Sequence, residues 1–387
     1  MKPIVRAGRM KPVHSDIRGP LFVEAMKRQK QGIDILKLNT GNPATFGFGL
    51  PDSIKNALME HMQDGVGYCD FKGMPQARQA ICDYETSKGI KGITSDDVFI
   101  GNGVSEVVSF ALTPLLNDGD EVLVPSPSYS LWGNSVYLED GKPVFYTCDE
   151  QANWYPDIQD IRSKITDKTK AIVIINPNNP TGVLYPKELL LEIIQIARES
   201  GLLIFADEIY DRLVMDGKQH ISLASLTEDV PVITLNGLSK SHCLCGYRCG
   251  WMVISGPREL TEDYRQGIIQ LTSLRLCANT MAQIVIPAAL DDMETPASMV
   301  RPGGRIYEQR EATVRELEKI DGLSFVKNDA AFYVFPKLDV KKFNITNDKQ
   351  FAHDLLDVTN ILLVPGSGFD WKDPDHFRIV MLPQADI

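Results

Sequence analysis

LNGLSKSHCLCGYRCGW, residues 235–251, is the stretch from which the rest of the sequence is best interpreted. It begins at the end of an apolar run, PVITL, which is short and β-branched enough to form a buried parallel strand. Lys240 follows this strand, and Arg248 precedes the next apolar run, WMVI. We expect desolvation and nearby cations to lower the pKa of Lys240 and to free its amine as a nucleophile toward an aldehyde. The alternative interpretation is a solvated loop lysine and a surface arginine.

The composition excludes several classes of protein. The chain has 387 residues, of which 43% are hydrophobic, and a net charge of −11, so nucleic acid and anionic membranes are poor partners. Charges and prolines interrupt the first twenty residues, which predicts neither a signal peptide nor a membrane span, and no later run is long enough to cross a bilayer. Seven scattered cysteines do not form a disulfide framework and indicate a cytoplasmic protein.

Apolar strands alternate with amphipathic helices from residue 97 onward. The predicted strands are 97–100, 121–124, 143–147, 171–175, 202–206, 231–235 and 251–254. This order predicts an α/β fold in which a large domain holds a mainly parallel, seven-stranded sheet between helices. Short strands and charged helices near the end of the chain predict a smaller α+β domain. We expect residues 1–44 to form an arm and part of the small domain, residues 45–288 the large domain, and residues 289–387 the small domain.

Ligands of such sheets bind beyond the carboxyl ends of the strands, so the residues after each strand were compared first. GNGVSE, residues 101–106, opens a helix whose first amides can bind phosphate, although plain turn chemistry is the alternative. Tyr129 lies in PSPSYSLW, where its ring can stack on a planar ligand or pack in the core. NPNNPTG, residues 176–182, is a rigid loop whose asparagines can donate to an oxygen.

Asp207 and Glu208 follow another predicted strand. A carboxylate at a buried strand end costs several kcal/mol unless a cation or donor meets it. A protonated ring nitrogen would meet Asp207, whereas an ion pair with a nearby helix is the simpler explanation for Glu208. These strand ends together offer a phosphate site, a stacking ring, an acid and an amine. This set is complementary to pyridoxal 5′-phosphate.

Cys243, Cys245 and Cys249 crowd the same stretch and raise the question of a metal site. Tetrahedral zinc usually takes paired cysteines or histidines at recurring spacings, and no second pair is present. We therefore expect no metal and interpret the three cysteines as small residues packed beside a pocket.

The chain resembles the class I/II aminotransferases, which are fold type I pyridoxal-phosphate enzymes. The strings that carry the resemblance are LNTGNP, NPNNPTG, ADEIY, the SK pair with GYRCGW, and FRIV, which run from Gly41 to Arg378. Within this family the chain is most similar to bacterial alanine (glutamate–pyruvate) aminotransferases, through strings such as DIRGP, GYCDFKG, IGNGVSE, RLCAN and PGGRIYEQR.

The resemblance implies a role for each matched residue. Lys240 would bind the pyridoxal group covalently and then move the substrate proton, Asp207 would pair with the ring nitrogen, and Tyr129 would stack on the ring. Asn179 and Tyr210 would contact the phenolic oxygen. The phosphate contacts would come from Gly103, Val104, Ser105, Ser239 and Arg248. Tyr68 would reach the phosphate of the neighbouring subunit, which implies a homodimer with shared active sites. Arg378 would bind the substrate α-carboxylate, aided by Gly41 and Asn179.

The resemblance implies transamination between an L-amino acid and a 2-oxo acid, alanine with 2-oxoglutarate above all. Aspartate or aromatic transamination, C–S β-lyase chemistry, and a non-catalytic ligand-sensing module are the alternatives. Arg18 and Arg275 are candidates for binding a side-chain carboxylate of the substrate. Ser15 and Cys243 depart from the pattern of the relatives, which bears on the substrate range.

Overall fold

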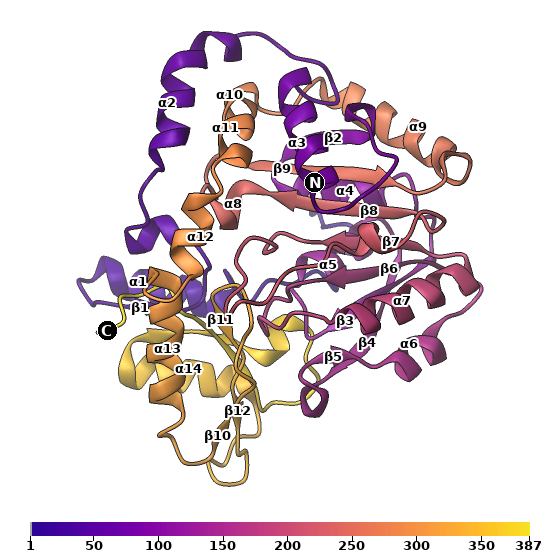
Figure 1. The fold of residues 1–387 in the computed structure, drawn as a ribbon. Helices are drawn as coiled ribbons and strands as arrows, with labels where there is room; N and C mark the ends of the chain where they lie inside the picture. The colour runs from indigo at the N-terminus through magenta and orange to yellow at the C-terminus, as the bar shows by residue number, and fades with distance from the viewer. Residues whose placement is uncertain (1) are drawn as a thin grey trace.

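The computed structural model describes residues 2–387 and has an eight-stranded mixed sheet at its centre (Figure 1). In spatial order the strands are β2 (Val98–Asn102), β9 (Cys249–Ser255), β8 (Val232–Gly237), β7 (Leu203–Asp207), β6 (Thr169–Ile175), β3 (Glu121–Ser126), β4 (Lys142–Asp149) and β5 (Tyr155–Pro156). Strands β8, β7, β6, β3 and β4 are parallel neighbours, whereas β9 is antiparallel to both of its neighbours and β5 is antiparallel to β4. The predicted mainly parallel sheet and its seven strands are confirmed. The added strand, β5, is only two residues long, too short to leave a periodic pattern.

Both faces of the sheet are covered, because alternate residues of the strands enter different cores. In β7, Ile204 and Ala206 pack with α6 and α7, whereas Phe205 packs on the opposite face with α4, α5 and α9. The helices around the sheet are α2 (Asp52–His61), α3 (Pro75–Ser87), α4 (Val104–Leu112), α5 (Leu131–Leu138), α6 (Ile158–Lys164), α7 (Lys187–Ser200), α8 (Leu238–Ser241), α9 (Arg258–Arg275), α10 (Thr280–Ile284) and α11 (Ile286–Asp291). Within residues 2–387 no single helix is both long and apolar enough to cross a bilayer, and α9 together with Thr280–Asp291 combines length and apolar composition only across a bend of 119°.

The remaining helices and strands lie at one end of the sheet, where the stretch of residues 20–37 meets the last part of the chain (Figure 1). They are α1 (Pro20–Lys30), β1 (Leu36–Lys37), α12 (Glu294–Val300), α13 (Arg305–Leu317), β10 (Leu323–Ser324), β11 (Tyr333–Val334), β12 (Lys337–Leu338), α14 (Asp348–Thr359), β13 (Ile361–Leu362), β14 (Val364–Pro365) and β15 (Phe377–Val380). Strand β1 pairs in parallel with β13, which attaches the N-terminal arm to the C-terminal part of the chain. The division into residues 1–44, 45–288 and 289–387 stays a prediction.

Strand β9 passes so close to the start of α4 that only glycine fits at position 250. A Cβ atom on Gly250 would lie 2.3 Å from the Val104 amide nitrogen and 2.4 Å from the Gly103 carbonyl carbon. Both are backbone atoms, so a side chain here displaces the helix. We expect Gly250→Ala to lower the free energy of unfolding by about 1–3 kcal/mol, the usual cost of overpacking. Urea denaturation measures this change.

Gly246→Ala is the matched control, because a Cβ atom on Gly246 would have no atom within 4 Å. Its effect should stay within about 0.5 kcal/mol, as for other surface substitutions. Equal losses in the two variants would contradict the steric explanation.

Candidate active site

Lys240 lies on α8, directly after the end of β8, and its amine is enclosed by groups from distant parts of the chain. Its Nζ donates a hydrogen bond to the carbonyl oxygen of Gly41 at 2.8 Å and lies 3.9 Å from Cys245 Sγ. The same amine is 5.8 Å from the centre of the Phe332 ring. The fold therefore places the only lysine of the 235–251 stretch in an enclosed position, and the alternative of a solvated loop lysine is wrong.

The expected lowering of the Lys240 pKa is also wrong. Burial lowers the pKa of this amine, but Tyr333, Cys245 and Tyr129 raise it by more, and the pKa of Lys240 lies above its ordinary value. The sequence indicates the burial of Lys240 from the apolar run before it. The sequence does not show that two phenols and a thiol lie near the amine, because Tyr333 and Tyr129 are far from Lys240 along the chain.

Asp207 is the last residue of β7, and its carboxylate is buried without an ion pair to any cation of residues 2–387. The residue is 5% exposed, and its Oδ2 accepts a hydrogen bond from Trp132 Nε1 at 3.1 Å. Its Oδ1 accepts a longer bond from the amide of Ile209, at 3.4 Å. Burial raises the pKa of Asp207 to about 6. A protonated nitrogen of a ligand would remove this electrostatic cost.

Arg378, on β15, is a buried cation without a carboxylate. It is 1% exposed, and no Asp or Glu among residues 2–387 forms an ion pair with it. Its Nη1 donates to Asn179 Oδ1 at 3.0 Å, its Nη2 donates to the carbonyl oxygen of Asn39, and its Nε has no partner. Burial lowers the pKa of this guanidinium, against the influence of Tyr333 and other phenols. Arg378 is therefore not a structural arginine paired with a carboxylate of the described chain.

Tyr333, on β11, connects the groups around Lys240 and Arg378. Its hydroxyl lies 2.9 Å from the hydroxyl of Tyr210, and the Arg378 guanidinium stacks over its ring at 4.6 Å. A Cβ atom on Gly41 would lie 2.2 Å from the same hydroxyl, so position 41 requires glycine for this contact. Gly41 is therefore more than a turn residue, because its missing side chain lets its carbonyl reach Lys240.

The start of α4 and Arg248 form an anion-binding arrangement. Gly103 precedes the helix with φ of 85°, a conformation that favours glycine. Arg248 is exposed, and its Nη2 donates to Ser105 Oγ at 3.1 Å, which brings the guanidinium next to the first amides of the helix, including that of Val104. Arg248 forms no ion pair with any residue from 2 to 387. A helix N-terminus beside a free arginine is well suited to phosphate.

The other predicted site residues differ in their exposure. Tyr129 is 37% exposed and lies near enough to Lys240 and Arg378 to affect the pKa of both. Ser239 is 8% exposed beside Lys240. Tyr68 is 83% exposed and is not part of the group that surrounds Lys240 in this chain.

The three neighbouring cysteines contact different groups. Cys243 Sγ lies 3.8 Å from Met299 Sδ, Cys245 donates to a backbone carbonyl of α8 at 3.0 Å, and Cys249 donates to the carbonyl of Ala282 at 2.8 Å. Burial raises the pKa of Cys243 and of Cys249 to about 12, so both are neutral thiols at physiological pH. Their contacts fit a packing role.

The two arginines considered for a substrate side chain lie in different environments. Arg275 Nη1 pairs with Glu106 Oε2 at 2.6 Å, and its Nη2 donates to the carbonyls of Phe71 and Ile100. Arg275 is therefore committed to holding α9 against α4 and is not available for a substrate. Arg18 and Ser15 are exposed.

Three residues of the site were not found from the sequence: Trp132, Tyr333 and Asn39. Trp132 stands three positions after Tyr129, and Asn39 stands in LNTGNP, so both lie in strings that indicate the site. Tyr333 lies in a short apolar run, AFYVFP, where nothing distinguishes it from a core aromatic.

Pyridoxal 5′-phosphate fits the charges of this site. Asp207 is a buried carboxylate without a cation, which suits a protonated pyridine nitrogen, and Arg248 at the start of α4 suits the phosphate. Lys240 supplies the enclosed amine. Arg378 remains for a second anion, such as a carboxylate of an amino acid.

Known proteins resemble this chain over nearly its whole length. A sequence model of the family described as aminotransferase class I and II matches residues 33–387. The glutamate-pyruvate aminotransferase AlaA of Haemophilus influenzae is 51% identical over 386 residues, covering 100% of this chain and 96% of that protein. An aminotransferase crystal structure from Escherichia coli has a TM-score of 0.98 at 48% identity, covering 100% of this chain and 95% of that one. An alanine aminotransferase structure from Pyrococcus furiosus has a TM-score of 0.93 at 41% identity, covering 99% and 96%.

Because the pKa of Asp207 is raised in the folded protein, the stability of the fold should depend on pH. The folded protein holds this proton more tightly than the unfolded chain does, so the buried charge costs stability as the pH rises from about 4 to about 6. Asp207→Asn has no charge at any pH and keeps an oxygen for Trp132. Relative to the wild type, with the cofactor removed from both, the variant should become more stable by about 2–3 kcal/mol between pH 4 and pH 8. Thermal unfolding across this range measures the difference, and a pH-independent difference would contradict the burial of the charge.

Proposed function

Because this chain belongs to the class I and II aminotransferases, we propose that it transfers an amino group between L-alanine and 2-oxoglutarate, with pyridoxal 5′-phosphate as cofactor. The observation that carries the proposal is Arg378, a buried guanidinium that has no carboxylate partner in the described chain and lies close enough to Lys240 to affect its pKa. The names of the relatives, glutamate-pyruvate and alanine aminotransferase, support the choice of substrates.

Residues from several elements would hold the cofactor. Lys240 would bind it covalently through Nζ, Asp207 would pair with the ring nitrogen, and Tyr129 would stack on the ring. Tyr210 and Asn179 would contact the phenolic oxygen. Asn179 Oδ1 accepts from Arg378, so its Nδ2 is the group left to donate to a ligand oxygen. The phosphate is assigned to Gly103, Val104, Ser105, Ser239 and Arg248.

When bound, pyridoxal 5′-phosphate supplies an electrophilic aldehyde and a protonated ring that accepts electrons. The buried Asp207 keeps its negative charge only beside an opposite charge, so it stabilises the protonated form of the ring nitrogen. Lys240 Nζ, once free as an amine, takes the proton from the substrate Cα. The Gly41 carbonyl, at 2.8 Å, holds this nitrogen in place between proton transfers.

Arg378 is proposed to orient the substrate. Its Nη1 is fixed by Asn179, and its Nε has no partner, so a carboxylate can accept from the guanidinium without displacing a buried acid. The rings of Tyr333 and Phe369, at 4.6 and 4.7 Å, hold the plane of the guanidinium. Both the amino acid and the 2-oxo acid carry the carboxylate that this arrangement requires.

A homodimer with shared active sites and a cytoplasmic location are part of the same proposal. Tyr68 is 83% exposed, which suits a residue that reaches the phosphate site of a neighbouring subunit. All seven cysteines are free thiols, as is usual in a reducing compartment.

A panel of amino donors, each assayed with pyruvate and with 2-oxoglutarate, tests the proposed function. Alanine with 2-oxoglutarate should give the highest kcat/KM, with glutamate and pyruvate as the reverse pair. Lys240→Ala is the control and should have no transaminase activity, because it lacks the amine that moves the proton. Preference for aspartate or an aromatic donor would reject the substrates proposed. Release of ammonia and pyruvate without an acceptor would indicate a lyase.

Arg378→Lys tests how the substrate is bound. Lysine keeps the charge but loses the two parallel donors, so substrate binding should weaken by about 1.5–3 kcal/mol, the range for a hydrogen bond to a charged group. The amino acid and the 2-oxo acid should weaken together, and the cofactor spectrum should stay unchanged. Substrate titrations followed through that spectrum measure both effects. Unchanged affinity for both substrates would assign Arg378 a purely structural role.

A further inference from the structure

Lys88, at the C-terminal end of α3, lies at the centre of a buried group of three carboxylates. Its Nζ is 2.6 Å from Glu85 Oε2, 2.8 Å from Glu208 Oε2 and 3.2 Å from Asp211 Oδ2. The lysine side chain is 12% exposed, and the three acid side chains are 0–3% exposed. We call Lys88, Glu85, Glu208 and Asp211 the Lys88 cluster. The expected ion pair of Glu208 with a nearby helix is thereby confirmed.

Each acid of the Lys88 cluster also accepts a hydrogen bond from another element. Glu85 accepts from Trp251 Nε1, on β9, at 3.1 Å. Glu208 accepts from Ser222 Oγ at 2.8 Å and from a backbone amide at 3.1 Å. Asp211 accepts from Asn236 Nδ2, on β8, at 2.7 Å. The Lys88 cluster therefore joins α3 to the ends of three neighbouring strands of the sheet.

These strand segments are the ones that carry the active-site residues. Glu208 directly follows Asp207, and Asp211 directly follows Tyr210. The amide of Asp211 donates to the carbonyl of Glu208 at 3.0 Å to close the turn. Asn236 stands four positions before Lys240. Glu208 and Asp211, three positions apart, thus belong to the Lys88 cluster, whereas Asp207 and Tyr210, also three positions apart, belong to the site.

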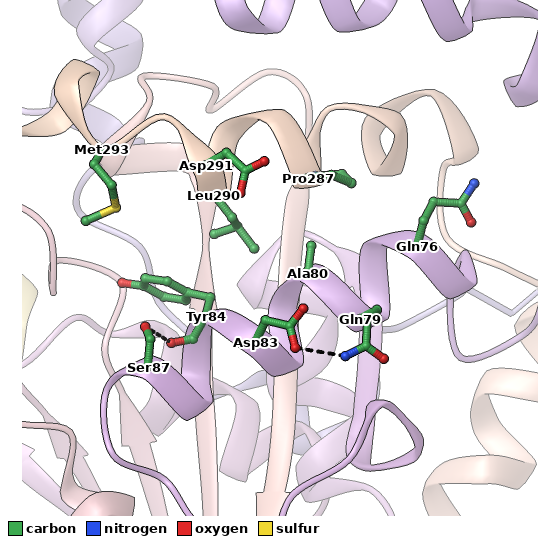
Figure 2. Close-up of a pocket in the computed structure, with 10 residues that line it drawn as sticks. All are labelled: Gln76, Gln79, Ala80, Asp83, Tyr84, Ser87, Pro287, Leu290, Asp291 and Met293. Carbon is green, nitrogen blue, oxygen red and sulfur yellow. Dashed lines mark hydrogen bonds between the residues drawn. The ribbon is translucent and has the colours of Figure 1, made fainter.

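One side of the Lys88 cluster is covered by Tyr84. Its hydroxyl donates to Asp211 Oδ2 at 2.5 Å, and its ring is stacked by Arg212 at 4.2 Å. Tyr84 also lines a cavity of about 500 Å³ between α3 and α11, together with Gln76, Asp83 and Leu290 (Figure 2). Lys88 does not line this cavity, so Tyr84 lies between the open surface and the buried charges.

We propose that Lys88 is a positioning residue for transamination, which holds the 207–211 segment so that Asp207 and Tyr210 face the cofactor. The inference rests on the proposed function, because it concerns the orientation of cofactor-binding side chains. Without the amine, the buried carboxylates of Glu208 and Asp211 repel each other. His220 Nε2 lies 3.9 Å from Glu208 Oε2, but burial lowers the pKa of this imidazole, so it is a poor replacement for the Lys88 charge. The turn between them then rearranges, and it carries Tyr210 and the adjoining Asp207 with it. Small displacements of such groups have large effects on rate.

Lys88→Met in the holoenzyme is the test, and Arg265→Met is the matched control. Arg265 Nη1 is paired with Asp97 Oδ1 at 2.6 Å, both side chains are 6–7% exposed, and Asp97 precedes β2 at the end of that strand away from Gly103. Both variants leave a buried carboxylate without its cation, so both should lose thermal stability. Only the loss of the Lys88 ion pairs is expected to change cofactor binding and turnover.

At a temperature where both variants are folded, Lys88→Met should bind pyridoxal 5′-phosphate about 10-fold more weakly and lose about 100-fold in kcat. The pH titration of the visible cofactor band should shift as well, because Tyr210 no longer holds its position. Arg265→Met should keep the wild-type affinity and titration. The inference is overturned if both variants keep the wild-type affinity and titration, or if both lose them to the same extent.

Asp211→Asn is the second variant, for use where Lys88→Met does not fold. Asparagine is isosteric and keeps an oxygen for Tyr84 and Asn236, but it loses the ionic bond to Lys88. It should change the cofactor affinity and the band titration in the same direction, and wild-type values overturn the inference. A wild-type protein that does not bind pyridoxal 5′-phosphate overturns the proposed function as well. A wild type that binds it, beside a Lys88→Met variant that binds it equally well, overturns the inference alone.

Discussion

Asp207 and Arg378 are buried charged residues, and no opposite charge in the described chain neutralises either of them. The rest of the structure has to offset the free-energy cost of burying these two charges. An unpaired charge in an apolar interior costs several kcal/mol, which is a large part of the net stability of a domain. The sheet offsets this cost with a core on each of its faces. A cation at Asp207 and an anion at Arg378 remove the cost, so ligand binding and folding stability are linked.

At the end of β7, a carboxylate with an ion-pair partner stands next to one that has none in the described chain. Asp207 and Glu208 are adjacent, yet Asp207 has no cation while Glu208 is 2.8 Å from Lys88. Successive side chains of extended backbone point in opposite directions, so one residue of the pair faces the site and the other faces α3. Glu208 lies among the paired charges of the Lys88 cluster, whereas Asp207 forms an ion pair with no cation of residues 2–387. Two adjacent acids at one strand end therefore have different electrostatic surroundings.

Local patterns predicted the sheet and most of the site, whereas contacts between distant residues were not predictable. Alternation along β7 and the position of Asp207 after it follow from spacing within a few residues. The carboxyl ends of parallel strands share an edge, which brought Lys240 and Asp207 together in the prediction. Nothing local shows that Tyr333 raises the pKa of Lys240, or that Lys88 pairs with Glu208 across 120 positions. Strand β5, with two residues, is too short for any periodic signal.

The segment from Asn39 to Gly41 joins the two halves of the site. Its Asn39 carbonyl accepts from Arg378 Nη2, and its Gly41 carbonyl accepts from Lys240 Nζ. Arg378 lies on β15 of a separate three-stranded sheet, whereas Lys240 lies on α8 after a strand of the eight-stranded sheet, so their relative position depends on this segment as well as on the packing between these elements. The segment follows β1, whose pairing with β13 fixes it to the C-terminal part of the chain. The amine and the guanidinium, to which the proposed function assigns proton transfer and carboxylate binding, are thus held by neighbouring carbonyls, which would set the distance that a bound amino acid has to span.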